Sequence, residues 1–353
     1  MHSEITPASC HALALLVCAT AFASCAMPAR AGSANGTFVA GTFINSARPD
    51  NNNGGVSSID IGNDFLDGSL RGLVRFNLPA ALNERVSITG ATLSMTTTAV
   101  PPDGTAGAAT VYVERLTEEW GQGTGAGVAA SGSYTAGSPC TGTGATWNKP
   151  LCSGAGWATA GGSVAGTISA SASVPATSGS LVQWNAAGIA SDVQAWANDV
   201  TTNHGWRLRS STEASYDTLQ AFMKGPQLAT TYTCKSSFQE TASGCTTCTT
   251  AAKAACVTSQ AGNACVDSGP PSTEHSCSCG NAAYVIGPGG TSCVDKNECV
   301  PNHCTDFGDP AAACTDHVAP ETGYSCQCSE GFVASGGTCV DYIFVDGFEA
   351  LGP

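Results

Sequence analysis

Charged residues are scarce in this sequence, and basic residues are the scarcer kind. Asp, Glu, Lys and Arg make up 11% of its 353 residues, and 13 Lys and Arg stand against 27 Asp and Glu, which leaves a formal net charge of −14. Such an excess of negative charge disfavours contact with a phosphate backbone or an anionic membrane surface. Nucleic acid is therefore not an expected partner.

Long apolar runs are also missing. The apolar stretch at residues 12–23 is too short to cross a bilayer, which takes about 20 residues, so no transmembrane segment is predicted. A small-x-small cleavage site, Ala29-Arg30-Ala31, follows it. We therefore predict that residues 1–31 are a secretory signal removed before Gly32. The start of this segment lacks Lys and Arg, and Cys25 in a poor lipobox leaves a lipid anchor as the alternative.

Catalytic signatures are sparse. Residues 32–233 contain one histidine, His204, and no Gly-x-Ser-x-Gly elbow to place a nucleophile beside it. Glu118 and Glu119 are adjacent, so on a strand they face opposite ways, whereas a glycosidase pair lies about 5–9 Å apart across a cleft. Asp192 and Asp199 are the remaining, distant candidates for a catalytic partner. The sequence therefore favours a protein that is not an enzyme.

Cysteine, in contrast, is plentiful. Of the 19 cysteines, 14 lie between Cys234 and Cys339, in a region that has 13 acidic residues and three Lys up to the end of the chain. Disulfides at this density indicate an oxidising, extracellular environment, and acidity of this kind is typical of calcium-binding extracellular regions. Zinc is the competing interpretation, since Cys245 and Cys248 have CxxC spacing, but no second CxxC follows.

The region before these cysteines has short segments in which apolar and polar residues alternate. This pattern, with Gly-rich turns, predicts an antiparallel β-sandwich with one face buried. The predicted strands are residues 73–78, 86–95, 109–116, 205–209 and 228–232.

One helix and two long loops are predicted between these strands. Residues 186–198 have Ile189, Val193 and Trp196 on one helical face. Residues 121–144 and 153–179 are so rich in Gly, Ala and Ser that we expect surface loops, with Cys140 and Cys152 closing a local one.

Residues 33–233 contain a set of ordered motifs at residues 51–55, 59–62, 71–79, 91–93, 116–120, 146–148, 192–196, 203–206 and 225–228. The ordered set resembles the DNRLRE (disaggregatase-related) domain, which is related to a class of carbohydrate-binding modules. The resemblance implies a jelly-roll-like β-sandwich, found on secreted and surface proteins and linked to polysaccharide. The long loop between Trp120 and Trp147 departs from the pattern.

Six tryptophans lie in this region, and aromatic rings serve both sugar stacking and core packing. Trp147, Trp184 and Trp196 lie in contexts typical of a core. Trp120 and Trp157 border the loops, so they are the candidates for exposure and carbohydrate binding.

The last cysteine block opens on Asp295-Lys296-Asn297-Glu298-Cys299 and continues with Cys304, Cys314, Cys326, Cys328 and Cys339. This lead and this cysteine order resemble the calcium-binding EGF-like module. The resemblance implies one Ca²⁺, whose hard oxygen ligands would be the carboxylates of Asp295, Glu298 and Asp316 and the carbonyls of Lys296 and His317. It also implies three disulfides, Cys299–Cys314, Cys304–Cys326 and Cys328–Cys339. Seven residues separate Asp316 from Tyr324, three more than is usual for the family, which leaves a further ligand from Gly323 open.

The preceding block is similar to a degraded copy of this module. Cys248, Cys256 and Cys265 could fill its first three cysteine positions, which would leave Cys234 to pair with Cys245. It lacks the acidic lead, so no calcium is predicted there.

The expected organisation is a signal peptide (1–31), a DNRLRE-like β-sandwich (32–233), a degenerate EGF-like block (234–293), a calcium-binding EGF-like module (294–340) and a tail (341–353). We expect a secreted, non-catalytic protein that binds an extracellular polysaccharide or a surface protein, with the EGF-like pair as a calcium-stiffened spacer. The alternatives are a polysaccharide-degrading enzyme and a structural surface protein without a ligand.

Overall fold

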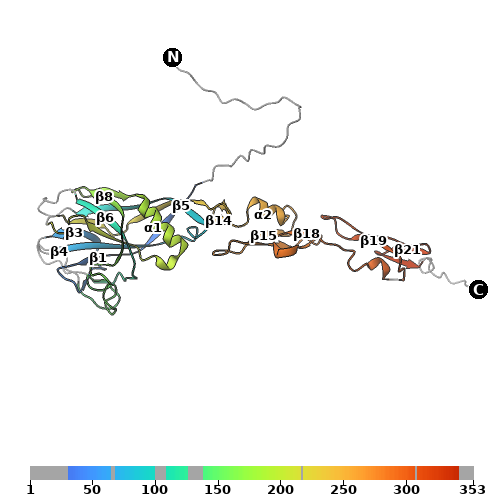
Figure 1. Cartoon of the computed structure of the whole chain (residues 1–353), viewed down its shortest axis with the longest axis horizontal. Helices are drawn as coiled ribbons and strands as arrows, with labels where there is room; N and C mark the ends of the chain where they lie inside the picture. The colour runs from blue at the N-terminus through green and yellow to red at the C-terminus, as the bar shows by residue number, and fades with distance from the viewer. Residues whose placement is uncertain are drawn as a thin grey trace, which may run out of the picture.

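The molecule is a β domain followed by a row of small disulfide-rich modules (Figure 1). The computed structural model describes residues 31–64, 68–99, 109–125, 138–215, 218–306 and 308–341. The predicted signal up to residue 30 and the tail from residue 342 lie outside these ranges. The predicted fold class, mostly β and antiparallel with small disulfide-rich modules behind, is confirmed.

The β domain is built from twelve strands and two helical segments. They are β1 (Gly32–Asn45), β2 (Asn51–Asn52), β3 (Ser58–Asp64), β4 (Gly68–Asn77), β5 (Val86–Ala99), β6 (Ala109–Leu116), β7 (Ser138–Pro139), β8 (Val164–Val174), β9 (Leu181–Trp184), α1 (Ala187–Asn198), the 3-10 helix η1 (Val200–Thr202), β10 (Trp206–Ser210), β11 (Gln220–Met223) and β12 (Gln227–Cys234). The five predicted strands correspond to β4, β5, β6, β10 and β12.

Hydrogen bonding closes part of this domain into a six-stranded barrel. Strands β1, β12, β5, β11, β3 and β4 pair in that order, and β4 pairs back with β1. The closure depends on the length of β1, since residues 32–36 pair with β12 while residues 37–45 pair with β4. A strand shared in this way joins two sheets that would otherwise face each other as a sandwich. Strands β10, β6 and β8 extend the sheet beyond β4.

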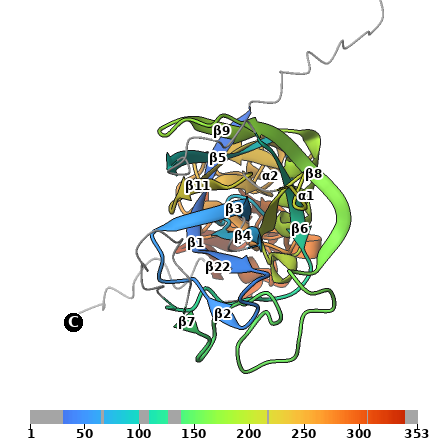
Figure 2. The ribbon, with the colours of Figure 1, turned by 90° about the vertical axis from the view of Figure 1, so that its left-hand side faces the viewer.

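The main core combines apolar residues of the barrel strands with others from β6, β8, β9, β10 and α1. Ile189, Val193 and Trp196 are buried, which confirms the predicted helical face. The rings of Trp196 and Trp206 have centroids 4.5 Å apart. Burying side chains of this size stabilises a fold by about 1.5–3 kcal/mol each. Figure 2 views the domain end-on and places α1 beside β6 and β8.

The prediction of two long surface loops is wrong in its main part. Residues 164–174 form β8, which pairs with β6. Described residues from 117 to 163 fold over the outer face of the sheet and add a second apolar cluster that contains Leu73, Trp120 and Trp157. Small residues permit this packing because the backbone can approach closely. A Cβ on Gly121, for example, would lie 1.7 Å from the carbonyl oxygen of Thr143.

The disulfide-rich part consists of short antiparallel hairpins. Its elements are β13 (Gln239–Thr241), β14 (Gly244–Thr246), α2 (Thr250–Ala255), β15 (Asn263–Asp267), β16 (His275–Cys279), β17 (Tyr284–Ile286), η2 (Pro288–Gly290), β18 (Cys293–Asp295), η3 (His303–Thr305), β19 (Ala313–Asp316), β20 (Tyr324–Gln327), β21 (Phe332–Ser335) and β22 (Thr338–Asp341). Their small cores consist mainly of half-cystines. Covalent links replace the large apolar interior that modules of this size cannot build.

Candidate functional sites

Sulfur pairing organises the last module. Its three disulfides join Cys299 to Cys314, Cys304 to Cys326 and Cys328 to Cys339, in the order that the EGF-like resemblance implies. The preceding block has the same order, and two further disulfides lie in the β domain and at its end. These bonds are Cys140–Cys152, Cys234–Cys245, Cys248–Cys265, Cys256–Cys277 and Cys279–Cys293. Disulfides at this density indicate an oxidising environment.

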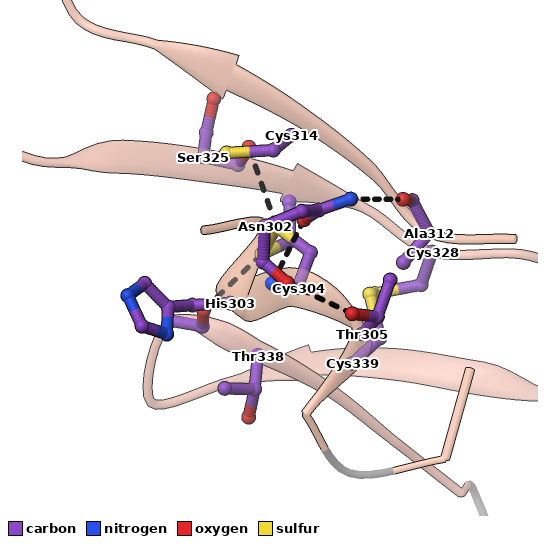
Figure 3. The surroundings of a disulfide bond; sticks show 12 residues. Asn302, His303, Cys304, Thr305, Ala312, Cys314, Ser325, Cys328, Thr338 and Cys339 are labelled. Atoms are coloured by element: carbon purple, nitrogen blue, oxygen red, sulfur yellow. Dashed lines mark hydrogen bonds between the residues drawn. A yellow bond between two sulfur atoms is a disulfide. The ribbon is translucent and has the colours of Figure 1, made fainter. Parts of the chain in front are cut away.

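The turn before β19 shows how this module holds its backbone (Figure 3). Asn302 accepts a hydrogen bond from the Cys304 N–H at 3.1 Å and donates one from Nδ2 to the Ala312 carbonyl oxygen at 3.1 Å. Thr305 Oγ1 donates to the Asn302 carbonyl oxygen at 2.8 Å. Cys304 itself is fully buried. One amide side chain thus ties η3 to the loop that leads into β19.

Asp309 also holds the backbone of this module, and the sequence prediction missed it. Its oxygens accept hydrogen bonds from the Ser329 N–H at 2.8 Å, the Ser329 Oγ at 2.7 Å and the Ala311 N–H at 3.1 Å. Burial alone would raise the pKa of Asp309, but these donors lower it below its ordinary value. Asp309 precedes Pro310, and this Asp-Pro pair is the sequence feature that could have indicated a turn held by the Asp309 side chain. Cys328 and Cys339 lie beside it, but their sulfurs are bonded to each other and unavailable to a metal.

The carboxylates of the predicted calcium site come from both sides of the junction between the last two modules. Asp295 ends β18, and its Oδ1 accepts the Ala319 N–H at 2.9 Å. Asp316 ends β19, and its Oδ1 accepts the Glu298 N–H at 2.9 Å. The Oε2 of Glu298 is buried without a hydrogen-bond partner.

The two predicted carbonyl ligands lie in the same neighbourhood. Lys296 donates its N–H to the Ala283 carbonyl oxygen at 3.0 Å, and His317 donates its N–H to the Gly323 carbonyl oxygen at 3.1 Å.

These donors fit a hard cation in kind, because they are oxygens and one of them is buried and unpaired. Their present spacing is wider than a closed site. Within the described ranges, the one group of three acidic, His or Cys ligands that gathers within 4.8 Å is the Asp309 cluster. Occupation by Ca²⁺ would therefore require Asp295, Glu298 and Asp316 to come closer together than they lie here.

The predicted exposure of Trp120 and Trp157 is wrong. Their exposed fractions are 1% and 6%, and both rings belong to the second apolar cluster. Trp120 Nε1 donates to the His204 carbonyl oxygen at 2.7 Å, and Trp157 Nε1 donates to the Thr146 carbonyl oxygen at 2.9 Å. Both rings are covered because the Gly-rich segment folds back over the sheet. Trp147, assigned to the core from its sequence context, is only partly buried.

Each acidic residue weighed for catalysis has a structural partner instead. Glu119 binds Arg75, and its Oε2 lies 3.3 Å from His204 Nδ1. Burial would raise the pKa of Glu119, but the neighbouring Arg75 guanidinium holds it below its ordinary value. Glu118 Oε1 accepts the Ala158 N–H at 3.0 Å, and Asp199 Oδ1 accepts the Thr201 N–H at 3.0 Å as the N-cap of η1.

Asp192, the remaining acidic residue weighed for catalysis, accepts hydrogen bonds from two side chains. Its Oδ2 accepts hydrogen bonds from Ser169 Oγ at 2.5 Å and from Trp206 Nε1 at 2.8 Å. Burial raises the pKa of Asp192 despite these donors. This carboxylate fastens α1 to β8 and β10, so its position is explained by packing.

The outer face of β4, β10 and β6 carries a network of guanidinium, carboxylate and aromatic groups. Glu114 Oε2 accepts from Arg207 Nη2 at 2.6 Å and from Arg209 Nε at 3.0 Å. The Arg209 guanidinium carbon lies 5.0 Å from the centroid of the Tyr112 ring. The alternation of Arg207, Leu208 and Arg209 is the sequence signal that could have placed both bases on one face.

The same face continues toward β4. Arg71 makes two hydrogen bonds to Glu213, at 2.7 and 2.9 Å, and its guanidinium carbon lies 4.5 Å from the centroid of the Trp147 ring. We call the set Arg71, Tyr112, Glu114, Trp147, Arg209 and Glu213 the arginine–aromatic face. Glu114 is buried, and the other members are only partly buried, so part of each of them lies at the surface.

A scan against family models finds no match to this chain, and a search of curated proteins finds none either. In the part of the chain that the structure describes, no helix is both long enough and apolar enough to cross a membrane.

Proposed function

We propose that this chain is a secreted, non-catalytic protein whose β domain binds an extracellular polysaccharide and whose disulfide-rich modules act as a spacer. The arginine–aromatic face is the observation that carries the proposal. It combines flat apolar rings with bidentate charged groups, and sugars offer apolar C–H faces and hydroxyls that match these two kinds of group. The DNRLRE resemblance of residues 33–233 points to the same ligand class.

The shape of the molecule supports a binding role for the β domain and a spacer role for the disulfide-rich modules. The modules follow the β domain in a row, so the last module lies well away from the β domain (Figure 1). Disulfides in every module limit the unfolding of such a spacer. The arginine–aromatic face lies on the β domain, where a spacer would leave it free to meet a ligand.

Calcium is part of the proposal for the junction between the last two modules. Asp295 belongs to the hairpin of the preceding module, whereas Glu298 and Asp316 belong to the last one. A cation held by all three carboxylates would couple the two modules and would give the buried Glu298 Oε2 a partner.

Retention on insoluble polysaccharides and binding on glycan arrays, both with calcium present, test the ligand. We expect specific retention that Tyr112→Ala and Arg209→Ala each weaken about tenfold or more, since an aromatic or charged anchor contributes about 1–2 kcal/mol or more to binding. Lys253→Ala, on the exposed surface of α2 in the spacer, is the matched control and should leave retention unchanged.

Other results would identify the alternatives. Absence of retention on every glycan would reject the binding proposal and leave a structural surface protein. Release of reducing ends from a retained polysaccharide would instead support the enzyme alternative, and its loss in Asp192→Asn or Glu118→Gln would assign the residues.

A further inference from the structure

The first residues of β1 are packed against the end of the β domain that meets the disulfide-rich modules. Gly32 is buried and pairs with Tyr232 of β12. A Cβ at Gly32 would lie 2.5 Å from Tyr232 Cζ and 2.8 Å from its hydroxyl oxygen. No larger residue fits there without moving the tyrosine ring, so the backbone nitrogen of Gly32 is held at a defined place.

A groove of about 970 Å³ opens beside this place. Its lining includes Gly32 and Ser33 of β1 together with Phe238, Glu240 and Thr250 of the first disulfide-rich block. The lining contains one acidic residue, Glu240, and no Lys, Arg or His among the described residues. It is therefore a site with a negative charge and no cation of its own.

Glu240 is the unusual residue of this groove. Its Oε2 is buried and has no hydrogen-bond partner. Burial, and then the negative charge of Glu240, raise the pKa of Tyr232, whose ring packs on Gly32. A buried carboxylate oxygen without a partner is costly, since such groups are normally paired or hydrogen-bonded. A cationic hydrogen-bond donor in the groove would give Glu240 Oε2 a partner.

We propose that cleavage after Ala31 creates an α-ammonium group on Gly32 and that this group binds the Glu240 carboxylate in the groove. Hydrolysis by a signal peptidase consumes one water: Ala31 leaves with the new carboxyl group, and the Gly32 nitrogen becomes an amine that takes up a proton at neutral pH. Before cleavage the same nitrogen is a neutral amide with one hydrogen. Export processing thus supplies the missing cation and locks β1 to the first module.

The inference rests on the cleavage site expected from the sequence, which mass spectrometry of the exported protein tests separately. We expect Gly32 as the first residue of the mature chain. A mature chain that begins elsewhere, or that is lipidated at Cys25, would overturn the inference whatever its thermal stability.

The ion pair itself is tested on the mature chain with a free or an acetylated Gly32 amine, each combined with Glu240 or Glu240→Gln. NMR titration of the reductively ¹³C-methylated amine should give a pKa about one unit higher with Glu240 than with Gln, which is about a tenfold change in the deprotonated fraction at a given pH. Acetylation should lower the midpoint of thermal unfolding only when Glu240 is present. Glu330→Gln, exposed in the last module, should change neither quantity.

Equal amine pKa values in the two backgrounds, or an equal effect of acetylation in both, would overturn the ion pair. If Glu240→Gln does not fold, the wild-type chain still decides. A Gly32 amine with an ordinary pKa in the folded protein would reject the proposal, and one raised in the folded state and ordinary after unfolding would support it.

Discussion

Arg85 Nη1 lies 2.8 Å from Asp267 Oδ2, so an ion pair joins the β domain to the first disulfide-rich block. The Arg85 side chain is 2% exposed, and its Nη2 also donates to the Ser272 carbonyl oxygen at 2.6 Å. Asp267 further accepts hydrogen bonds from Thr246 Oγ1 at 2.8 Å and from Thr247 Oγ1 at 2.9 Å. These contacts pair both terminal nitrogens of Arg85 with the block, so side-chain bonds as well as the connecting chain fix the block to the β domain.

Replacing Asp267 with Asn should destabilise the junction, because it leaves the buried Arg85 guanidinium without its charged partner. Losses of about 3–5 kcal/mol are typical for broken buried ion pairs. Since Asp267 is 26% exposed, we expect a value near the lower end, about 3 kcal/mol, from urea unfolding. Glu330→Gln is the exposed control and should change the free energy of unfolding by less than about 0.5 kcal/mol.

The same pair predicts a pH dependence. Burial would raise the pKa of Asp267, but hydrogen bonds from Arg85, Gly269 and the two threonines hold it far below its ordinary value. A carboxyl group with a lowered folded-state pKa stabilises the fold above its unfolded pKa of about 4, and this contribution is lost as the pH falls toward the folded-state pKa. The stability difference between wild type and Asp267→Asn should therefore be constant from pH 7 to 5 and shrink below pH 4. A difference independent of pH down to pH 2 would contradict this assignment.

Gly188→Ala should reverse the usual effect of a helical Gly-to-Ala change. Alanine is favoured over glycine in a helix by about 1 kcal/mol, but here its Cβ would lie 2.2 Å from the Ser169 carbonyl oxygen. We expect a net loss of about 1–3 kcal/mol, since overpacking pushes α1 off β8. Gly154→Ala, whose Cβ would meet its nearest atom at 3.4 Å, is the control in thermal unfolding. A more stable Gly188→Ala protein would show that α1 does not pack this closely.

Trp120→Phe should reduce stability without affecting ligand binding. The change removes the indole N–H that donates to His204 and leaves that carbonyl oxygen unpaired. A loss of about 1–3 kcal/mol is expected. Polysaccharide retention should stay at the wild-type level, in contrast to Tyr112→Ala. Selective loss of retention with unchanged stability would return Trp120 to the binding residues.

Glu298→Gln should weaken calcium binding, since it removes one of three carboxylates from the proposed site. Isothermal titration of the full mature chain with CaCl₂ should give one site in the wild type and an affinity about tenfold or more lower in the variant, because ligand charge tunes calcium affinity. EDTA should lower the wild-type melting temperature by more than that of the variant, since the more tightly bound ion stabilises the fold more. Equal titrations for Glu298→Gln and the Glu330→Gln control would place the calcium elsewhere, and no binding at millimolar calcium would remove the site.

Local patterns predicted the elements well and their surroundings poorly. The helical face of Ile189, Val193 and Trp196 was predicted because its period reports which side is buried. Exposure of Trp120 was predicted wrongly because composition suggested that a Gly-rich segment does not pack. Whether such a segment covers a ring depends on contacts such as that of Gly121 with Thr143, which no local pattern reports.

The sequence by itself determined that this protein is mostly β, that one helix lies among its strands, and that closely spaced cysteines shape its last third. These features follow from short-range periodicity and from cysteine spacing. The tertiary structure alone decided that β1 closes a barrel and that Arg85 meets a carboxylate 182 residues away. It also decided that Trp120 and Trp157 are buried, whereas Trp147 is only partly buried. The reason is physical: a strand or helix pattern specifies which face is buried, whereas the partner of that face is chosen by the packing of the whole chain.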